Sequence, residues 1–422
     1  MILKNITFQV LLAAIVGIAA AATFGDQSWL ATPSPAGYQF IVFLKTLFLS
    51  ALRMLIAPMI FFSLIGGIIG IGNVVRLRRL GGVTVTYYLG TTSIAILLAL
   101  IAVFFIHPWT AFPTAPELAQ SHAPARMINP GDDSILRVLT QLAGLAFTNP
   151  FSALVNLNIL GIVTNAFLIG IAIVLALPES SPVYKLVDDI NRVIYRVLGW
   201  IIRLMPIGIF AILFDFTLKL SLGEGQTESV LKQLLQFGGL VVALTLLHGL
   251  VILPLIGFLT TGKSPITLLS QIARPMLVAF STSSSSATLP VTMKTATEEM
   301  QVNPSVASFV LPLGATMNMD GTALFEAIAA VFLAYLFGID LSTTAIFTVF
   351  LMAMVSSIGA PGMPSASMAG MQMVLLAVGI PLEAIAILLV VERPLDTIRT
   401  AVNVEGDLVG SLVVDHFTRS KD

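Results

Sequence analysis

The sequence predicts an all-α polytopic membrane protein with eight transmembrane helices and two re-entrant helical hairpins. Hydrophobic residues make up 57% of the 422-residue chain and charged residues only 10%, whereas soluble domains carry about 25% charged residues. Apolar stretches at 8–22, 87–106 and 235–259 reach or approach the roughly 20 residues that cross a bilayer core. These stretches are continuous and not alternating, so they are typical of helices and not of barrel strands.

The predicted spans cover most of the chain. Transmembrane helices are expected near residues 6–25, 38–72, 83–107, 138–178, 184–216, 233–260, 304–337 and 380–413. Two further apolar segments, 265–298 and 344–376, contain clusters of Ser, Gly and Pro that interrupt a continuous helix. Each is expected to enter and leave the membrane on one side as a helix–turn–helix hairpin.

Basic residues predict the orientation, because Lys and Arg accumulate in short cytoplasmic loops. They follow the second, fourth and sixth predicted helices, at Arg76, Arg78, Arg79, Lys185, Arg192, Arg196 and Lys263. Lys4, Arg419 and Lys421 fall on the same side, so both termini are expected in the cytoplasm. We therefore expect a multi-pass protein of the inner (plasma) membrane.

The remaining composition narrows the function. A net charge of −1 offers no basic surface for nucleic acid, and the chain has no Cys. The four His residues are too scattered in sequence for a metal motif and the serines lack an evident His base, so no enzymatic activity is expected.

The C-terminal half is predicted to form, in order, a hairpin, a helix, a second hairpin and a second helix. That order is typical of an inverted repeat with a substrate site near the membrane midplane, so the site is expected after residue 260.

The last predicted helix carries a stripe of polar side chains. Its members are spaced by 4, 3, 4 and 4 residues and share one helical face: Glu392, Asp396, Arg399, Asn403 and Asp407. Charged residues inside membrane helices usually face a cavity or a partner. Arg399 can bind a carboxylate through two parallel bonds, and Asp396 can accept bonds from an ammonium group. The pair predicts an amino acid with a second carboxylate as the substrate; the alternative is an internal ion pair that only fixes packing.

The preceding helix combines carboxylates with a weak point. Asn318 and Thr322 lie one turn apart, and Gly321 weakens the helix between them. Unwinding there frees backbone carbonyls, which together with carboxylates are the ligands that hard cations prefer. Asp320 and Asp407 are the leading candidate cation ligands. The alternative is that Asn318 and Asp320 only bond to neighbouring helices.

Glu326 lies one turn beyond Thr322 and has no evident basic neighbour in the sequence. A carboxyl group held away from water favours its protonated form, which makes Glu326 a candidate proton carrier. The alternative is a permanently protonated side chain that serves only as a hydrogen-bond partner.

The two hairpin tips offer polar groups to ions. Residues 281–286 comprise five Ser and one Thr, and their N–H and hydroxyl groups suit an anion. Residues 357–364 offer carbonyls and a flexible lid, in which Gly359 and Gly362 act as hinges or simply permit a tight turn. Neither tip is taken as a linker, because lipid cannot satisfy a linker backbone.

These motifs resemble those of the dicarboxylate/amino acid:cation symporter family, which includes the animal excitatory amino acid transporters and the archaeal aspartate transporters. The matches are the serine-rich tip with Thr288-Leu289-Pro290, the Asn-Met-Asp-Gly-Thr motif at 318–322, and the run from Asp396 to Asp407. Segments 87–92 and 148–151 also fit, so the resemblance covers essentially the whole chain.

The resemblance implies a homotrimer in membrane lipid, in which each subunit works alone by an elevator mechanism. It places scaffold helices at 1–72 and 138–216 and transport-domain helices at 83–107 and 233–260. The transport-domain core, with both hairpins and the last two helices, is expected at 265–422.

The resemblance also implies residue roles. Arg399 would bind the side-chain carboxylate of the substrate and Asp396 its ammonium group. The other substrate contacts are expected at Ser284, Ser285, Thr322, Met363, Thr400 and Asn403. Sodium sites are expected from Gly314, Asn318, Asn403 and Asp407; from Tyr88, Thr91, Thr92, Asn318 and Asp320; and from backbone around Thr316, Ser357, Ile358 and Ala360.

The same resemblance implies the substrate and the ions that are coupled to its transport. Relatives that prefer neutral amino acids lack the arginine at 399, and dicarboxylate carriers lack the aspartate at 396, so glutamate or aspartate is expected here. Glu326 resembles the proton-coupling glutamate of the animal members. Family members often place a second arginine next to the site, at one of two positions that here hold Ser283 and Thr397. Arg393 can substitute for that arginine, or Glu392 can neutralise Arg393.

The expected function is therefore symport of glutamate or aspartate, driven by sodium and protons. Coupling to protons alone is the alternative within transport. An anion channel or an amino acid sensor on the same scaffold is the alternative from another class, although a channel needs no paired Asp396 and Arg399. Glutamate and aspartate differ by one methylene, typically worth about 1–3 kcal/mol in a pocket, so the sequence does not choose between them.

Overall fold

The computed structural model describes residues 6–31, 33–69, 77–106, 140, 143–220, 226–359, 367–380 and 384–419. Every regular element within these residues is a helix, which confirms an all-α protein. Over the same residues, three helices are long and apolar enough to cross a membrane, or four if one bent pair counts as a span. The full count of eight spans and two re-entrant hairpins stays a prediction.

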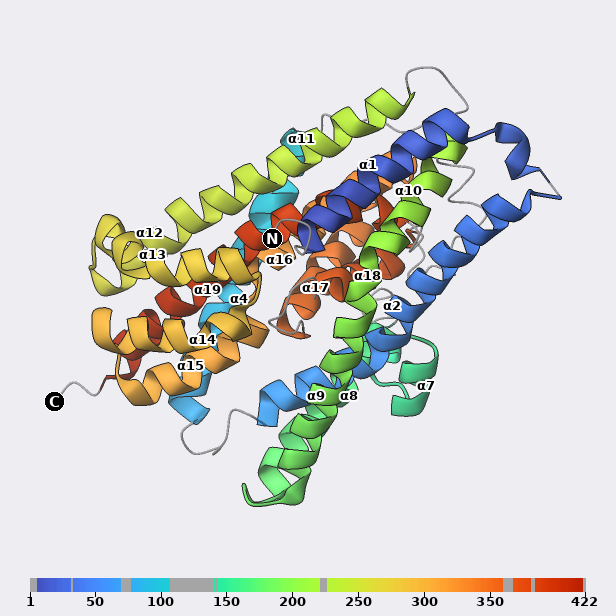
Figure 1. Cartoon of the computed structure of the whole chain (residues 1–422). Helices are drawn as coiled ribbons and strands as arrows, with labels where there is room; N and C mark the ends of the chain where they lie inside the picture. Colours follow the sequence, from blue (N-terminus) through green and yellow to red (C-terminus); the bar gives the residue numbers. More distant parts are fainter. Residues whose placement is uncertain are drawn as a thin grey trace.

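One group of helices comes from the first half of the chain. Its members are α1 (Ile6–Phe24), α2 (Ala36–Ile69), α7 (Pro150–Val155), α8 (Ile159–Ala176), α9 (Pro182–Arg203) and α10 (Met205–Leu220). The central member is α2, which packs against α8, α9 and α10, while α10 also packs against α1. Figure 1 shows α1, α2 and α10 together on one side of the molecule.

An ion pair between a partly exposed lysine and a buried aspartate joins two helices of this group. Lys45 on α2 lies 2.7 Å from Asp215 on α10, and the Tyr38 hydroxyl donates a hydrogen bond to the other oxygen of the same carboxylate. Removing one partner of such a pair leaves an uncompensated buried charge. The contact therefore fixes α2 against α10.

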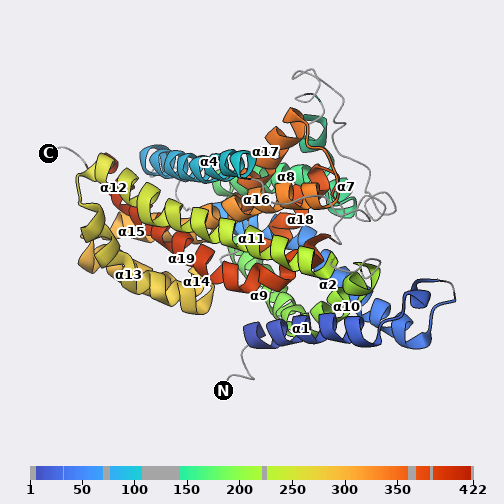
Figure 2. The same ribbon diagram turned by 90° about the horizontal axis from the view of Figure 1, so that it is seen from above.

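The second group surrounds the last helix. Its members are η3 (Leu77–Gly81), α4 (Gly82–Phe105), α11 (Gln226–Leu247), η4 (His248–Ile252), α12 (Leu253–Thr261), α13 (Pro265–Thr282), α14 (Ser285–Lys294), η5 (Thr295–Glu299), α15 (Pro304–Met317), α16 (Asp320–Leu336), α17 (Thr343–Gly359), α18 (Ser367–Ala377) and α19 (Ile385–Thr418). Helix α19 packs against α12, α13, α15 and α16, and α4 packs against α16. Figure 2 shows α19, in red, alongside α11 and α13.

The two segments predicted as hairpins each form a packed helix pair. Helices α13 and α14 pack against each other and turn at Ser283, whose φ of 50° is left-handed. Helices α17 and α18 also pack against each other. Residues 360–366 between them, with Ala360, Gly362 and Met363, lie outside the described residues.

Two helices predicted as continuous are interrupted, so these expectations were wrong in detail. Within 138–178, α7 ends at Val155 and α8 begins at Ile159, because Asn158 accepts the amide of Gly161 and caps a new helix. Within 184–216, α9 and α10 meet at a bend of 52°. Pro206, in the first turn of α10, has no N–H to continue the ladder of α9.

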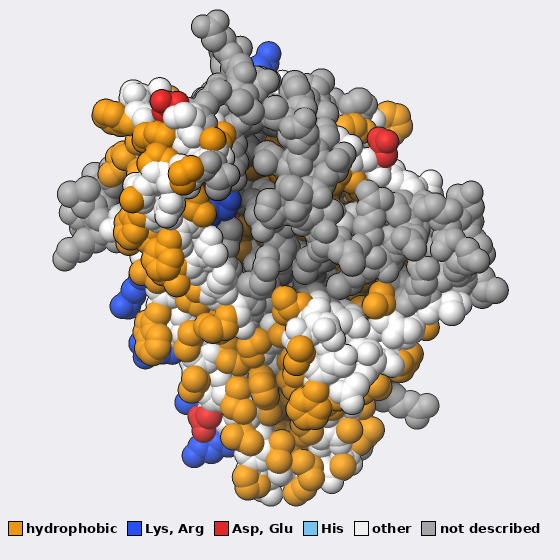
Figure 3. All heavy atoms as spheres, turned by 90° about the vertical axis from the view of Figure 1, so that its right-hand side faces the viewer, with side chains coloured by type: hydrophobic (Ala, Val, Ile, Leu, Met, Phe, Trp, Pro, Cys, Tyr) orange, Lys and Arg blue, Asp and Glu red, His pale blue; other side chains and the backbone are white. Residues whose placement is uncertain are grey.

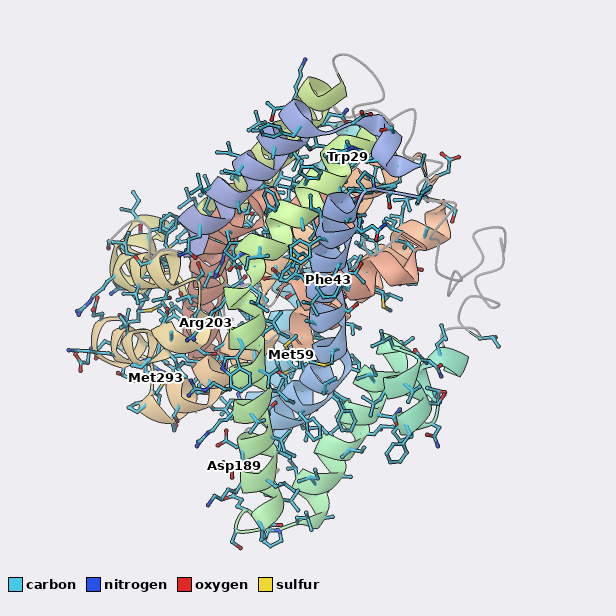
Figure 4. The ribbon with its side chains drawn as sticks, turned by 45° about the vertical axis from the view of Figure 1, so that its right-hand side comes forward. Trp29, Phe43, Met59, Asp189, Arg203 and Met293 are labelled. Atoms are coloured by element: carbon cyan, nitrogen blue, oxygen red, sulfur yellow. The ribbon has the colours of Figure 1, made fainter. Side chains whose placement is uncertain are left out.

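The surface of the molecule carries many large apolar side chains, in addition to the apolar core. Large apolar side chains such as Val155 and Ile266 are about four-fifths exposed, and Figure 3 shows many hydrophobic side chains on the lower and left-hand parts of the face that it draws. In Figure 4, Phe43 and Met59 lie along α2; Phe43 is exposed and Met59 is buried. Lipid tolerates such a surface, so the exposed apolar residues agree with a membrane protein.

Candidate substrate and cation site

The predicted polar stripe of α19 is buried on one face of the helix. All five of its members are less than one-tenth exposed, and Glu392 and Arg399 are fully buried. The spacing of 4, 3, 4 and 4 residues keeps them aligned through about four turns. A stripe of charge inside the helix cluster requires partners, and the structure supplies them.

Arg399 lies at the centre of a cluster of polar groups. Its Nη2 atom lies 3.1 Å from Glu392 Oε1 and 3.2 Å from Asp396 Oδ1, and it donates to Ser367 Oγ on α18 at 3.2 Å. The guanidinium carbon lies 3.9 Å from the ring centroid of Phe325 on α16, in cation–π geometry. Four contacts from three helices therefore hold the side chain in place.

Most of the donor groups of Arg399 remain available. Its Nε and Nη1 atoms are buried and have no hydrogen-bond partner among the described residues. A buried donor without an acceptor is costly, more so on a charged group. The guanidinium thus presents N–H groups to an anionic acceptor, next to the carboxylate of Asp396.

Arg393 also lies close to the polar stripe. Its Nη1 atom lies 3.9 Å from Asp396 Oδ2, and Glu392 Oε1 accepts from Arg399. Asp396 therefore lies between two arginines. Both roles expected for Arg393, as a substitute for the second arginine or as a partner of Glu392, stay predictions.

The other predicted substrate residues on α16 and α19 lie close together. Asn403 Nδ2 donates to Thr322 Oγ1 at 3.3 Å, and Asn403 Oδ1 accepts the amide of Gly321 at 2.8 Å. Thr400 Oγ1 donates to the backbone oxygen of Asp396 at 2.7 Å. Asn403 thereby satisfies one of the free amides at the start of α16.

The helix break beside Asn403 lies slightly earlier than predicted. The chain leaves helical geometry at Asn318 and Met319, not at Gly321, and α16 starts at Asp320. Gly321 has a different reason for lacking a side chain, since a Cβ there would lie 2.9 Å from the backbone oxygen of Arg399. The predicted unwinding is thus present, and the glycine serves close packing.

The serine-rich tip is a structured cap. Ser284 is the N-cap of α14, and its hydroxyl accepts the amide of Ala287 at 3.1 Å. Ser284 and Ser285 are both buried, and α14 packs against α19. The structure therefore places this tip against the helix that carries the polar stripe.

A second cluster gathers the predicted cation ligands of α4, α16 and α19. Thr92 Oγ1 donates to Asp320 Oδ1 at 2.6 Å, and Thr91 Oγ1 lies 3.4 Å from the same oxygen and from Asn318 Oδ1. Asn318 Nδ2 donates to Asp407 Oδ1 at 3.1 Å. Carboxylate, amide and hydroxyl oxygens are the donor set that suits a hard cation.

Tyr88 and Gly314 complete this cluster. The Tyr88 hydroxyl donates to Val310 O at 2.7 Å. A Cβ on Gly314 would collide with the Asp407 carboxylate and the Tyr88 hydroxyl. A side chain at position 314 would thus occupy the space between these oxygens.

The third predicted set of cation ligands is only partly described. Thr316 Oγ1 and Ser357 Oγ donate to carbonyls of their own helices, at 3.1 and 2.9 Å. Helices α15 and α17, which carry Thr316, Ser357 and Ile358, pack against each other. Ala360 lies outside the described residues.

Glu326 is buried on α16 beside the second helix pair. The Ser356 hydroxyl donates to Glu326 Oε1 at 2.7 Å, whereas Oε2 has no partner among the described residues. A Cβ on Gly370 would collide with both groups, so α18 approaches them closely. The unpaired Oε2 is a place where a proton can be carried.

Two buried residues of this region were missed by the sequence reasoning. His248 Nε2 lies 3.0 Å from Asp320 Oδ2, and both side chains are fully buried. Glu405 is also fully buried, and neither of its oxygens has a partner among the described residues. Both lie in long apolar helices, where an ionisable residue is itself a signal of function.

Comparison with known proteins identifies the family of the chain. The family model for the sodium:dicarboxylate symporter family matches residues 6–417. An excitatory amino acid transporter of Caenorhabditis elegans is 30% identical over 92% of this chain and 83% of its own length. Excitatory amino acid transporter 5 of Mus musculus is 31% identical over 92% and 78%, and excitatory amino acid transporter 2 of Homo sapiens is 30% identical over 96% and 78%. The chain therefore belongs to the sodium:dicarboxylate symporter family and is a membrane transporter, not an enzyme.

Proposed function

We propose that the protein is a secondary active symporter of glutamate or aspartate, coupled to sodium and to protons. The observation that carries this proposal is the buried Arg399, whose Nε and Nη1 donors have no partner among the described residues and whose Nη2 atom lies 3.2 Å from Asp396 Oδ1. The three relatives named above are all excitatory amino acid transporters, and their names support the same substrate class.

The charges of the cluster suit an acidic amino acid. Arg399 is always protonated and binds a carboxylate with several N–H groups, so it takes the side-chain carboxylate of the substrate. Asp396 accepts hydrogen bonds from the ammonium group. Thr322, Thr400 and Asn403, together with the Ser284–Ser285 tip and Met363, supply the remaining contacts.

Sodium is proposed to bind at three places. The first uses Gly314, Asn318, Asn403 and Asp407; the second uses Tyr88, Thr91, Thr92, Asn318 and Asp320; the third uses backbone around Thr316, Ser357, Ile358 and Ala360. Support for the first two comes from the short oxygen–oxygen distances around Asp320 and from the bond between Asn318 and Asp407. The family description, which names sodium, supports all three.

The scaffold and transport domains are proposed with the boundaries expected from the sequence. In the first group α2 packs against α8, α9 and α10, and α10 packs against α1; in the second, α19 packs against α4, α11, α12, α13, α15 and α16. These contacts within each group are more extensive than those between the groups, which supports this division. A homotrimer, an elevator movement of the second group, and cytoplasmic termini complete the proposal.

Competition for uptake tests the substrate class. Proteoliposomes with a sodium gradient are expected to accumulate radiolabelled aspartate, and unlabelled glutamate or aspartate should compete. Succinate lacks the ammonium group that Asp396 binds, and alanine lacks the carboxylate that Arg399 binds, so neither should compete at equal concentration. Equal competition by succinate would contradict the role of Asp396.

Glu326 carries the coupled proton in this proposal. With a sodium gradient present, an additional inward proton gradient should stimulate aspartate uptake by the wild type and leave uptake by Glu326→Gln unchanged, because the amide cannot carry a proton. The matched control is Glu298→Gln, an exposed glutamate on η5 that should keep the response. An undiminished proton response in Glu326→Gln would remove Glu326 from the coupling.

A further inference from the structure

His248 makes a contact that sequence spacing does not suggest. It is the first residue of η4, a π-helical turn between α11 and α12, and its Nε2 atom lies 3.0 Å from Oδ2 of Asp320 at the start of α16. Both residues are fully buried. π-Helical turns inside α-helices frequently occur at functional sites.

We propose that His248 is a positioning residue of the sodium site, and that its Nε2–H group fixes the Asp320 carboxylate in the orientation that sodium binding requires. Imidazole groups next to a metal site commonly act in this way, by holding a ligand in place through a second layer of hydrogen bonds. The inference rests on the proposed sodium coupling and adds a residue to it.

The contacts of the ring agree with this direction of donation. An ionised carboxylate, the form that serves as a sodium ligand, can only accept, so Nε2 is then the atom that donates. Nδ1 is buried and has no partner among the described residues. A proton on Nδ1 would be a buried donor without an acceptor, so the contacts favour the tautomer with its proton on Nε2.

The two carboxylate oxygens of Asp320 contact different groups. Oδ2 faces His248, while Oδ1 accepts from Thr92 at 2.6 Å and lies 3.4 Å from Thr91. Thr91 in turn lies 3.4 Å from Asn318 Oδ1. Fixing Oδ2 from one side therefore directs Oδ1 toward the hydroxyl and amide oxygens of the proposed site. Without the bond, the carboxylate can rotate about its terminal torsion, which has broad minima.

The test uses two amide variants that differ in reach. His248→Gln places an amide nitrogen about as far from the backbone as Nε2 and retains the bond; His248→Asn is one methylene shorter and loses it. Thr245→Val is the matched control, because it removes a buried hydroxyl one turn earlier that has no partner among the described residues.

The readout is sodium binding without transport. The melting temperature of the purified full-length protein is measured over a range of sodium concentrations, with choline replacing sodium and with no amino acid present. We expect His248→Asn to raise the half-saturating sodium concentration about tenfold or more, since losing such a supporting bond typically costs about 10- to 100-fold in metal affinity. His248→Gln and Thr245→Val should stay close to the wild type.

The possible results separate the inference from the function on which it rests. If sodium stabilises the wild type and His248→Asn responds to the same concentrations, His248 does not position the ligand and only the inference fails. Equal losses in both amide variants would also overturn the inference, because the bond itself would not matter. If sodium does not stabilise the wild type, the proposed sodium coupling fails first. A purely structural role would lower the melting temperature in choline and leave the half-saturating concentration unchanged.

Discussion

Proteoliposomes that contain Arg399→Ala are expected to accumulate no aspartate above the level of empty vesicles. The variant removes the proposed partner of the substrate carboxylate and leaves that carboxylate in a buried site without a counter-charge. Breaking a buried ion pair by removing one partner costs about 3–5 kcal/mol, a factor of about 10² to 10⁴ in affinity. Uptake of radiolabelled aspartate under a sodium gradient measures the loss.

Glu392 complicates this prediction and also sharpens its test. Arg399→Ala leaves Glu392 without the guanidinium that lies 3.1 Å away, so part of the loss can come from a buried Glu392 that lacks this counter-charge. The double variant Arg399→Ala/Glu392→Gln removes both charges of the pair. If Arg399 binds the substrate, the double variant stays inactive; recovered aspartate uptake would contradict its role as a substrate ligand.

Arg419→Ala is the matched control for Arg399. Arg419 lies near the end of the same helix and pairs with Asp415 at 2.7 Å, outside the proposed substrate site. The control should retain uptake. Sodium should still raise the melting temperature of Arg399→Ala, whereas aspartate should no longer add to it, which separates lost substrate binding from misfolding.

Asp407→Asn is expected to abolish sodium binding at the first proposed site. Asparagine has nearly the same shape, so packing is preserved while a negative charge is lost. Truncating a buried, hydrogen-bonded charge costs about 2–5 kcal/mol, a factor of about 30 to 5,000 in affinity. The half-saturating sodium concentration for aspartate uptake should therefore rise beyond the measurable range.

Asp415→Asn controls for the loss of a buried aspartate from α19. Asp415 is as buried as Asp407 but pairs with Arg419 two turns further along the helix. The control should keep the wild-type sodium dependence. A sodium dependence in Asp407→Asn that equals the wild-type value would remove Asp407 from the cation site.

The polar stripe of α19 was predictable because its signal is local. A spacing of 4, 3, 4 and 4 residues places side chains on one face whatever surrounds the helix, and the structure buries all five members. The two helix pairs were predictable for a similar reason, since Ser, Gly and Pro clusters interrupt apolar segments in the sequence itself. The pairing of Glu392 with Arg399 was also available from their spacing of seven.

Contacts between distant segments were not predictable in this way. His248 and Asp320 are 72 residues apart, and nothing in the sequence says which face of α11 and η4 meets the start of α16. The break at Asn318 and Met319 depends on a bond from the Gly321 amide to Asn403 on α19. Helices α7 and α8 each begin after an asparagine N-cap. These caps are not recognisable within a continuous apolar pattern.

Uptake of radiolabelled aspartate and glutamate under separately imposed gradients tests the central claim most directly. Wild-type proteoliposomes should concentrate both amino acids when only an inward sodium gradient is imposed, and an added inward proton gradient should increase the rate. A potassium gradient imposed in the same vesicles completes the set of driving ions. Accumulation with a proton gradient and no sodium would show coupling to protons alone, and currents without accumulation would contradict symport altogether.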